Sequence, residues 1–313
     1  MLNGGLKMKN ILLGKTNIKV PAVSVGCMRL NSLDDNGAVN FISHALENGL
    51  NYFDHADIYG NGECEKLFGR TIKQIGIDRE KIFIESKCGI VPGVMYDFSY
   101  NHIMSSVDEI LQRLETEYID MLLLHRPDAL MEPEEVAKAF DDLHASGKVN
   151  YFGVSNIKPM QIELLKKYVN QDIQANQLQL SITNSQMIRN GLEVNMFTEG
   201  SLDRDGSVLD YCRLNDITIQ AWSPFQFGFF EGVFLDNDRF ADLNRTIYEV
   251  AGKYGVSNTA VAVAWILRHP ANMQMISGTM NSNRLDEICK GAQIELSREE
   301  WYKIYLSAGN MLP

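Results

Sequence analysis

Short runs of apolar residues recur along the chain at nearly even spacing. Each run is four to eight residues long, which is typical of a buried strand. The eight runs predict strands over residues 22–28, 51–55, 81–87, 120–125, 151–156, 173–179, 217–223 and 273–278. Because these strands are apolar along most of their length, they favour a parallel sheet that is covered on both faces.

The segments between these runs carry helical patterns. In residues 102–114, Ile103 and Val107 belong to an apolar set with a period near 3.6, and residues 132–148 have acids in their first turn and a glycine near their end. Strand and helix therefore alternate, in units of about 36 residues. Eight such units close most naturally as a (β/α)8 barrel, the TIM-barrel fold.

The rest of the chain fits this architecture as a single domain over residues 1–313. Residues 11–26 contain a turn at 15–17 and predict a short N-terminal β-hairpin ahead of the first barrel strand. Additional helices are expected after the last strand. We interpret residues 1–7 as a flexible leader and Met8 as the natural start.

Composition and charge narrow the classes of function. A net charge of −11 and a pI near 5.1 argue against nucleic acid or an anionic membrane as a partner. No apolar run reaches the length of a membrane span, and the N-terminus lacks a signal-peptide core. The five cysteines are far apart and form no CxxC, so neither disulfides nor zinc is indicated. We expect a cytoplasmic protein.

Ionisable side chains gather where three successive predicted strands end. Asp54 and Tyr59 follow the second strand, Lys87 ends the third and His125 ends the fourth. In a barrel of this kind the chemistry lies at these C-terminal ends. An ammonium lowers the pKa of a nearby phenol, a carboxylate holds the ammonium charged, and a histidine can donate to a carbonyl oxygen. Together the four residues predict a site that protonates an oxygen gaining negative charge.

Each of these residues also has a purely structural interpretation. Asp54 fits a helix cap, Lys87 a solvated loop cation, and a histidine after a strand is more often structural than catalytic. His55 and Asp57 flank Asp54 and suggest a metal site, but no second cluster of ligands supports one. We therefore expect no metal.

Five motifs resemble those of the aldo-keto reductases, in the same order along the chain. They are FDHADIYGNGECEKLFG from residue 53, ESKCG from 85, DMLLLHRPD from 120, GVSN from 153 and AWSP from 221. The resemblance runs from Leu13 to about Leu306. It implies reduction of an aldehyde or ketone to an alcohol, with Asp54, Tyr59, Lys87 and His125 as the catalytic tetrad and Tyr59 as general acid.

The same resemblance implies a nicotinamide cofactor. Ser155, Asn156 and Gln177 match the positions that hold the carboxamide of the nicotinamide. Trp222 matches an aromatic position, often Tyr in the family, that stacks on the nicotinamide ring. Ser223 and Pro224, from the AWSP motif, are expected to bind the cofactor as well.

Residues 277–288 resemble the family's segment for the adenosine phosphate. Thr279 and Arg284 match its hydroxyl and arginine positions, and Glu287 matches an acid near the adenine. Gly278 stands where many members have Lys, so one positive charge is missing from the implied 2'-phosphate site, of which Gly278 is still part.

This segment can also be read as an ordinary helix entry, with Ser282 or Asn283 as the N-cap. We nevertheless expect NADPH as the cofactor, with NADH as the weaker alternative.

The substrate stays open beyond a small-molecule carbonyl compound. The loops at residues 89–100 and 224–234 carry aromatic residues that can line an apolar pocket, and Arg29 fits a surface, cofactor or substrate contact.

Two rival functions remain at the level of sequence. One is a cofactor-binding sensor or regulatory module of the same fold with slow turnover. The other is a Schiff-base aldolase built on Lys87. Asp54 and Tyr59 favour the reductase, because a charged lysine is a poor nucleophile.

Overall fold

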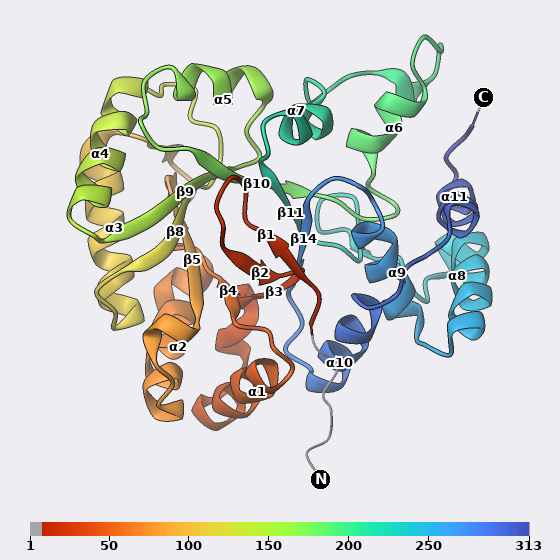
Figure 1. Ribbon diagram of the computed structural model, residues 1–313, viewed down its shortest axis with the longest axis horizontal. Helices are drawn as coiled ribbons and strands as arrows, with labels where there is room; N and C mark the ends of the chain where they lie inside the picture. Colours follow the sequence, from red (N-terminus) through yellow and green to blue (C-terminus); the bar gives the residue numbers. More distant parts are fainter. Residues whose placement is uncertain (1–7, 313) are drawn as a thin grey trace.

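Eight parallel strands form a closed barrel in the computed structural model, which describes residues 8–312 (Figure 1). Around the barrel the order is β3, β4, β5, β8, β9, β10, β11 and β14, closing back onto β3. The strands are β3 (Val23–Gly26), β4 (Tyr52–Asp54), β5 (Phe83–Cys88), β8 (Ile119–Leu124), β9 (Val149–Ser155), β10 (Ile173–Gln179), β11 (Thr218–Trp222) and β14 (Met273–Ser277). The predicted (β/α)8 barrel is confirmed, whereas the interpretation of residues 1–7 lies outside the described residues.

Helices ring the barrel and separate its strands (Figure 1). They are α1 (Asp35–Glu47), α2 (Glu63–Ile75), α3 (Tyr100–Leu114), α4 (Pro133–Ala145), α5 (Pro159–Lys166), α6 (Gln186–Leu192), α7 (Val208–Leu214), α8 (Ala241–Tyr254), α9 (Asn258–Leu267), α10 (Ser282–Gly291) and α11 (Arg298–Ser307). Both helices singled out from the sequence exist. The Ser99 side chain caps α3, and Pro133 begins α4 where its missing N–H costs nothing.

The N-terminal hairpin lies across the end of the barrel where the strands begin. It consists of β1 (Asn10–Leu12) and β2 (Lys19–Pro21), drawn in red in front of the barrel strands in Figure 1. Its turn is tied to the N-terminal ends of two strands, because Gly14 N donates to Thr218 Oγ1 (2.7 Å) and Lys15 N to Gln174 Oε1 (2.9 Å). Leu13 packs into the barrel with other buried side chains. The hairpin therefore covers the N-terminal ends of the barrel strands, and a ligand is expected at their C-terminal ends.

The C-terminal helices belong to the outer layer (Figure 1), and loops follow the C-terminal ends of the strands at that opposite end. Two small antiparallel pairs stand there, β6 (Ile90–Val91) with β7 (Met95–Tyr96) and β12 (Gln226–Phe227) with β13 (Gly232–Val233). α11, one of the expected C-terminal helices, is held through Trp301, whose indole stacks on Trp265 of α9 at 4.8 Å between ring centroids. This stack ties α11 to the outer layer of helices.

None of the helices described in the structure is both long and apolar enough to cross a bilayer. All five cysteines are buried and free in the structure.

Candidate active site

A buried ion pair lies at the C-terminal ends of the barrel strands. Lys87 Nζ donates to Asp54 Oδ1 at 2.5 Å and to the carbonyl oxygen of His55 at 2.6 Å. The Lys87 side chain is fully buried and that of Asp54 is 3% exposed. Burial by itself lowers the pKa of the ammonium, but the negative charge of Asp54 and its neighbours outweighs this, so the pKa of Lys87 is raised. Lys87 is therefore a charged residue at neutral pH.

Tyr59 completes a triangle with this pair. It begins a tight 3-10 turn, η2 (Tyr59–Gly62), in which Gly60 has φ 58°. A side chain at Gly60 would start 2.5 Å from Asn31 Nδ2, so the turn needs glycine there. The turn places the Tyr59 hydroxyl 3.2 Å from Lys87 Nζ.

The pKa of Tyr59 departs from the value expected from the sequence. Burial raises it and Lys87 lowers it, and burial is the larger effect, so the pKa rises to about 12. The lysine thus acts in the predicted direction, but the net shift is opposite. The sequence shows the ammonium next to the phenol and does not show how completely both are withdrawn from water.

His125 lies beside Tyr59, directly after β8. The two ring centroids are 6.1 Å apart, edge to face, and Nδ1 of His125 is buried without a hydrogen-bond partner in the described part of the chain. Burial, followed by the charges of Lys87 and Arg126, lowers the pKa of His125 well below its usual value. The imidazole is therefore neutral at physiological pH and can offer one N–H to a ligand.

A polar network under the tetrad was not anticipated from the sequence. Glu85, two residues before Lys87 on β5, points into the barrel like Lys87. Its carboxyl group accepts from Tyr52 OH at 2.6 Å, Gln220 Nε2 at 2.8 Å and Gln177 Nε2 at 3.0 Å. Burial and the charge of Asp54 raise the pKa of Glu85 well above its usual value. The one available signal was an acid within an apolar strand at the same phase as Lys87.

The residues expected around a nicotinamide meet only in part. Trp222 Nε1 donates to Asn156 Oδ1 at 3.2 Å, and Asn156 Nδ2 donates to Ser155 Oγ at 2.8 Å, so these three form a connected group. The Gln177 amide instead turns inward and donates to Asp54 Oδ1 at 3.0 Å. Ser223, with φ 51°, turns the chain just after Trp222, and Pro224 follows it.

The expected adenosine end lies at the entry to α10. Asn281, rather than Ser282 or Asn283, caps this helix, and its Oδ1 accepts from Arg284 N at 3.0 Å. The proposed caps are wrong because both residues already belong to the helix.

Charged side chains stand exposed around this helix entry. Arg284 is exposed, with Thr279 and Glu287 half-buried nearby in sequence. Arg29 reaches across from the loop after β3, and its Nη1 donates to the carbonyl oxygen of Gly278 at 3.2 Å. A second guanidinium thus stands where the sequence indicated a missing charge.

The donor set at these two places suits the cofactor that the resemblance implies. The half-buried indole of Trp222 and the amide of Asn156 suit a nicotinamide, which is flat and carries a carboxamide. Arg29 and Arg284 form no ion pair within residues 8–312, and an unpaired guanidinium suits a phosphate. The residues present therefore fit a nicotinamide dinucleotide.

His55 and Asp57 do not assemble a metal site. Both ring nitrogens of His55 are buried without a hydrogen-bond partner among the described residues, and its ring packs on Phe68. Within residues 8–312 no three His, Cys, Asp or Glu side chains are grouped to hold a metal ion. Burial, aided by the charge of Glu65, raises the pKa of Asp57 to about 7.

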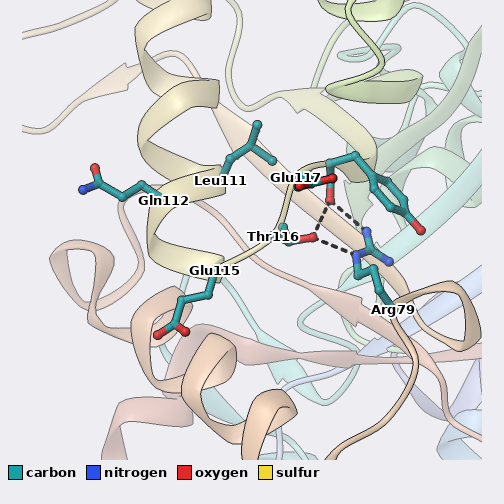
Figure 2. A pocket seen from close by; sticks show the side chains of 7 residues that line it. Arg79, Leu111, Gln112, Glu115, Thr116 and Glu117 are labelled. Atoms are coloured by element: carbon teal, nitrogen blue, oxygen red, sulfur yellow. Dashed lines mark hydrogen bonds between the residues drawn. The ribbon is translucent and has the colours of Figure 1, made fainter.

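A separate surface cavity of about 580 Å³ lies at the other end of the barrel strands (Figure 2). It is bordered by Arg79 and by residues 115–118, which precede β8. The Arg79 guanidinium is already bonded to Tyr118 O at 3.0 Å and Asp120 Oδ2 at 2.6 Å. This hollow contains none of the predicted site residues.

Comparison with known proteins identifies the family. A model of the aldo/keto reductase family matches residues 22–305. The chain is 35% identical over 311 residues to the uncharacterized oxidoreductase YcsN of Bacillus subtilis, covering 95% of this chain and 97% of that protein. It is 34% identical over 276 residues to a 6-dehydroglucose reductase of Agrobacterium fabrum, covering 85% and 86%.

A solved structure agrees with these matches. The crystal structure of the thermostable aldo-keto reductase Tm1743, in complex with the inhibitor epalrestat, has a TM-score of 0.78 and 26% identity, with 96% of this chain and all of that chain covered. The chain belongs to the aldo/keto reductase family, whose members are oxidoreductases that act on small-molecule carbonyl compounds with nicotinamide cofactors.

Proposed function

We propose that this protein reduces an aldehyde or ketone with NADPH, and that Tyr59 is the general acid. The observation that carries the proposal is the triangle of Lys87, Asp54 and Tyr59. It places a charged ammonium 3.2 Å from a phenol and 2.5 Å from a buried carboxylate.

Each tetrad residue has a distinct task. Bound reduced nicotinamide supplies the hydride to the carbonyl carbon. Tyr59, protonated at neutral pH, donates its proton to the carbonyl oxygen, which is a strong base as it becomes an alkoxide. Lys87 stabilises the phenolate that remains. Asp54 keeps Lys87 charged and fixes its position.

His125 acts on the carbonyl oxygen as a neutral hydrogen-bond donor. With its proton on Nε2, it can polarise the carbonyl and help to orient it toward Tyr59. Donation from a fixed imidazole needs no reorganisation of water during the reaction. The hydrogen bonds from His125 and Tyr59 would therefore hold the carbonyl oxygen of the substrate in one position.

On the cofactor side, Ser155, Asn156 and Trp222 would hold the nicotinamide. Gln177 can join them only if its amide leaves Asp54 or its free oxygen is used. Ser223 and Pro224 belong to the turn that carries the chain away from Trp222.

At the other end of the cofactor, Arg284, Thr279 and Gly278 would meet the adenosine phosphate and Glu287 the adenine. The exposed guanidinium of Arg284 supports NADPH over NADH, because the two cofactors differ by the 2'-phosphate. Arg29, bonded to Gly278, adds positive charge that does not depend on a lysine at position 278.

The aldolase alternative is less well supported. A Schiff base needs the neutral amine, and Asp54 and its neighbours raise the pKa of Lys87. Incubation with an aldehyde and borohydride should therefore leave Lys87 unmodified by mass spectrometry.

Turnover separates the reductase from a slow sensor module. A panel of aldehydes and ketones with NADPH, followed by the loss of reduced-cofactor absorbance, should give kcat of about 1 per second or more with the best substrate. Tight cofactor binding with turnover slower by about a thousandfold would favour the sensor and contradict the reductase.

A further inference from the structure

The residue after His125 is an arginine without a protein partner. Arg126 is half-buried, yet within residues 8–312 it forms no ion pair and donates no hydrogen bond. Two other half-buried arginines form ion pairs, Arg79 with Asp120 and Arg113 with Glu65. A guanidinium has five N–H donors, and none of those of Arg126 is among the buried unpartnered atoms of the described chain, so they remain open to solvent or to a ligand.

Two aromatic rings fix where the Arg126 guanidinium stands. Its central carbon lies 5.7 Å from the ring centroid of Trp222 and 5.8 Å from that of Phe229. The two rings meet edge to face, with 6.3 Å between their centroids, so the guanidinium contacts both rings at once. Contacts of this kind hold the flat cation in place and leave its N–H groups free.

The nearby acid is committed elsewhere. Asp128, two residues along the chain, accepts from Phe98 N at 2.9 Å through Oδ2 and from Leu130 N at 2.8 Å through Oδ1. It therefore shapes the loop, and it forms no ion pair with Arg126 within residues 8–312. Lys87 is paired with Asp54 and His125 is neutral, so Arg126 places next to His125 in the chain a positive charge that has no ion-pair partner within residues 8–312.

We propose that Arg126 binds an acidic group, a carboxylate or a phosphate, carried by the carbonyl substrate a few atoms from the reacting carbon. A planar guanidinium matches both groups through two parallel hydrogen bonds. His125 would hold the carbonyl oxygen while its neighbour in the chain holds the anion. A neutral substrate would displace water from the Arg126 guanidinium without forming an ion pair with it, and this cost disfavours binding of a neutral substrate. The proposal rests on the reductase function given above.

Two substrate pairs test it and separate the two kinds of acid. The first pair is 4-oxobutanoate and butanal, and the second is glyceraldehyde 3-phosphate and glyceraldehyde. We expect the wild type to prefer the acidic member of at least one pair by roughly tenfold or more in kcat/KM, the scale of a hydrogen bond to a charged group. The pair that shows the preference identifies the acid.

Arg126→Met keeps the bulk of the side chain against Trp222 and Phe229 and removes the charge. It should abolish the preference, mainly through a higher KM for the acidic substrate, and lower kcat/KM much less for the neutral substrate than for the acidic one. Arg126→Lys should keep part of the preference, because an ammonium keeps the positive charge but cannot form the two parallel hydrogen bonds of a guanidinium. Arg245→Met, which removes a cation paired with Asp242 on exposed α8, controls for net charge.

Three results would overturn the proposal: no preference for either acid in the wild type, equal losses on both members of a pair in Arg126→Met, or weaker NADPH binding in that variant. The last result would assign Arg126 to the cofactor.

A binding measurement distinguishes failure of this proposal from failure of the reductase function. Calorimetric titration of succinate into the protein with NADP⁺ needs no turnover. If no aldehyde is reduced but succinate binds to the wild type and not to Arg126→Met, the anion site stands and the reductase proposal fails. If butanal is reduced and neither acid is preferred, the reductase stands and the anion site fails.

Discussion

The two ends of the proposed cofactor cleft are built in opposite ways. At the tetrad, Lys87 and Asp54 are almost completely buried and bonded to each other. At the entry to α10, Arg284 is exposed and forms no ion pair within the described chain. One charged group is already satisfied by the protein, and the other is available for a ligand.

This difference reflects what each end is proposed to do. Proton transfer needs groups whose positions and charges are set before the substrate arrives, since reorganisation during the reaction adds to the barrier. Burying an ion pair costs desolvation energy, so such a pair is weak evidence for stability and is better explained by function. Recognition of a phosphate needs donors that remain free until the phosphate binds.

The largest effect is expected from breaking the buried pair. Lys87→Met leaves the Asp54 carboxylate buried without its cation, which should lower the free energy of unfolding by about 3–5 kcal/mol, as found for broken buried pairs. The same change removes the group that lowers the pKa of Tyr59, so the rate of alcohol oxidation should require a higher pH.

Urea denaturation and a pH profile of oxidation measure these two effects. Lys87→Met with Asp54→Asn removes both charges and should recover part of the lost stability. An unchanged denaturation midpoint in Lys87→Met would show that the pair is not buried as described, and the contrast with Arg284 would disappear.

Removing the proposed acid should affect rate more than folding. Tyr59→Phe should slow carbonyl reduction by roughly a hundredfold or more in single turnovers while cofactor binding is kept. Tyr302→Phe, at an exposed position of α11 far along the chain from the tetrad, is the matched control and should leave the rate unchanged. A Tyr59→Phe rate within about threefold of wild type would remove Tyr59 from the mechanism.

At the exposed end of the cofactor cleft, at the entry to α10, a substitution should change cofactor binding only. Arg284→Ala should weaken NADPH by about 1.5–3 kcal/mol and leave NADH nearly unchanged, because only NADPH has the phosphate that the guanidinium meets. Fluorescence titration of both cofactors measures this, with Arg245→Ala as the charge-matched control. Equal losses for both cofactors would place Arg284 away from the 2'-phosphate.

A smaller effect concerns Asp57, beside the tetrad. Burial raises its pKa to about 7, so the folded state holds this proton more tightly than the unfolded state does. The stability that Asp57 contributes below its unfolded pKa is therefore lost as pH rises toward 7. Asp57→Asn should make the protein more stable than wild type by about 1–2 kcal/mol at pH 8 and close to wild type at pH 4. Thermal unfolding at the two pH values checks the sign, and a loss of stability at pH 8 would contradict it.

The sequence by itself determined the barrel and the positions of its chemical groups along the chain. Runs of four to eight apolar residues mark strands because burial on both faces is a local requirement, and every predicted run overlaps a barrel strand. Asp54, Lys87 and His125 each lie at or just after the C-terminal end of a strand. Because the C-terminal ends of all parallel strands meet at one end of the barrel, these positions were enough to predict that the three residues lie there together.

Tertiary structure alone decided which groups meet and how strongly burial shifts their pKa. Glu85 became a neighbour of Gln220 and Gln177 only when the barrel closed, because strands far apart in the chain then face one another across its interior. The same closure withdrew Tyr59 from water, so its pKa rises although Lys87 lies 3.2 Å away. Arg126, just after β8, was brought to Trp222, the last residue of β11, although about a hundred residues separate them in the sequence. Distance and desolvation depend on the packing of the whole barrel, whereas hydrophobic periodicity depends on neighbours along the chain.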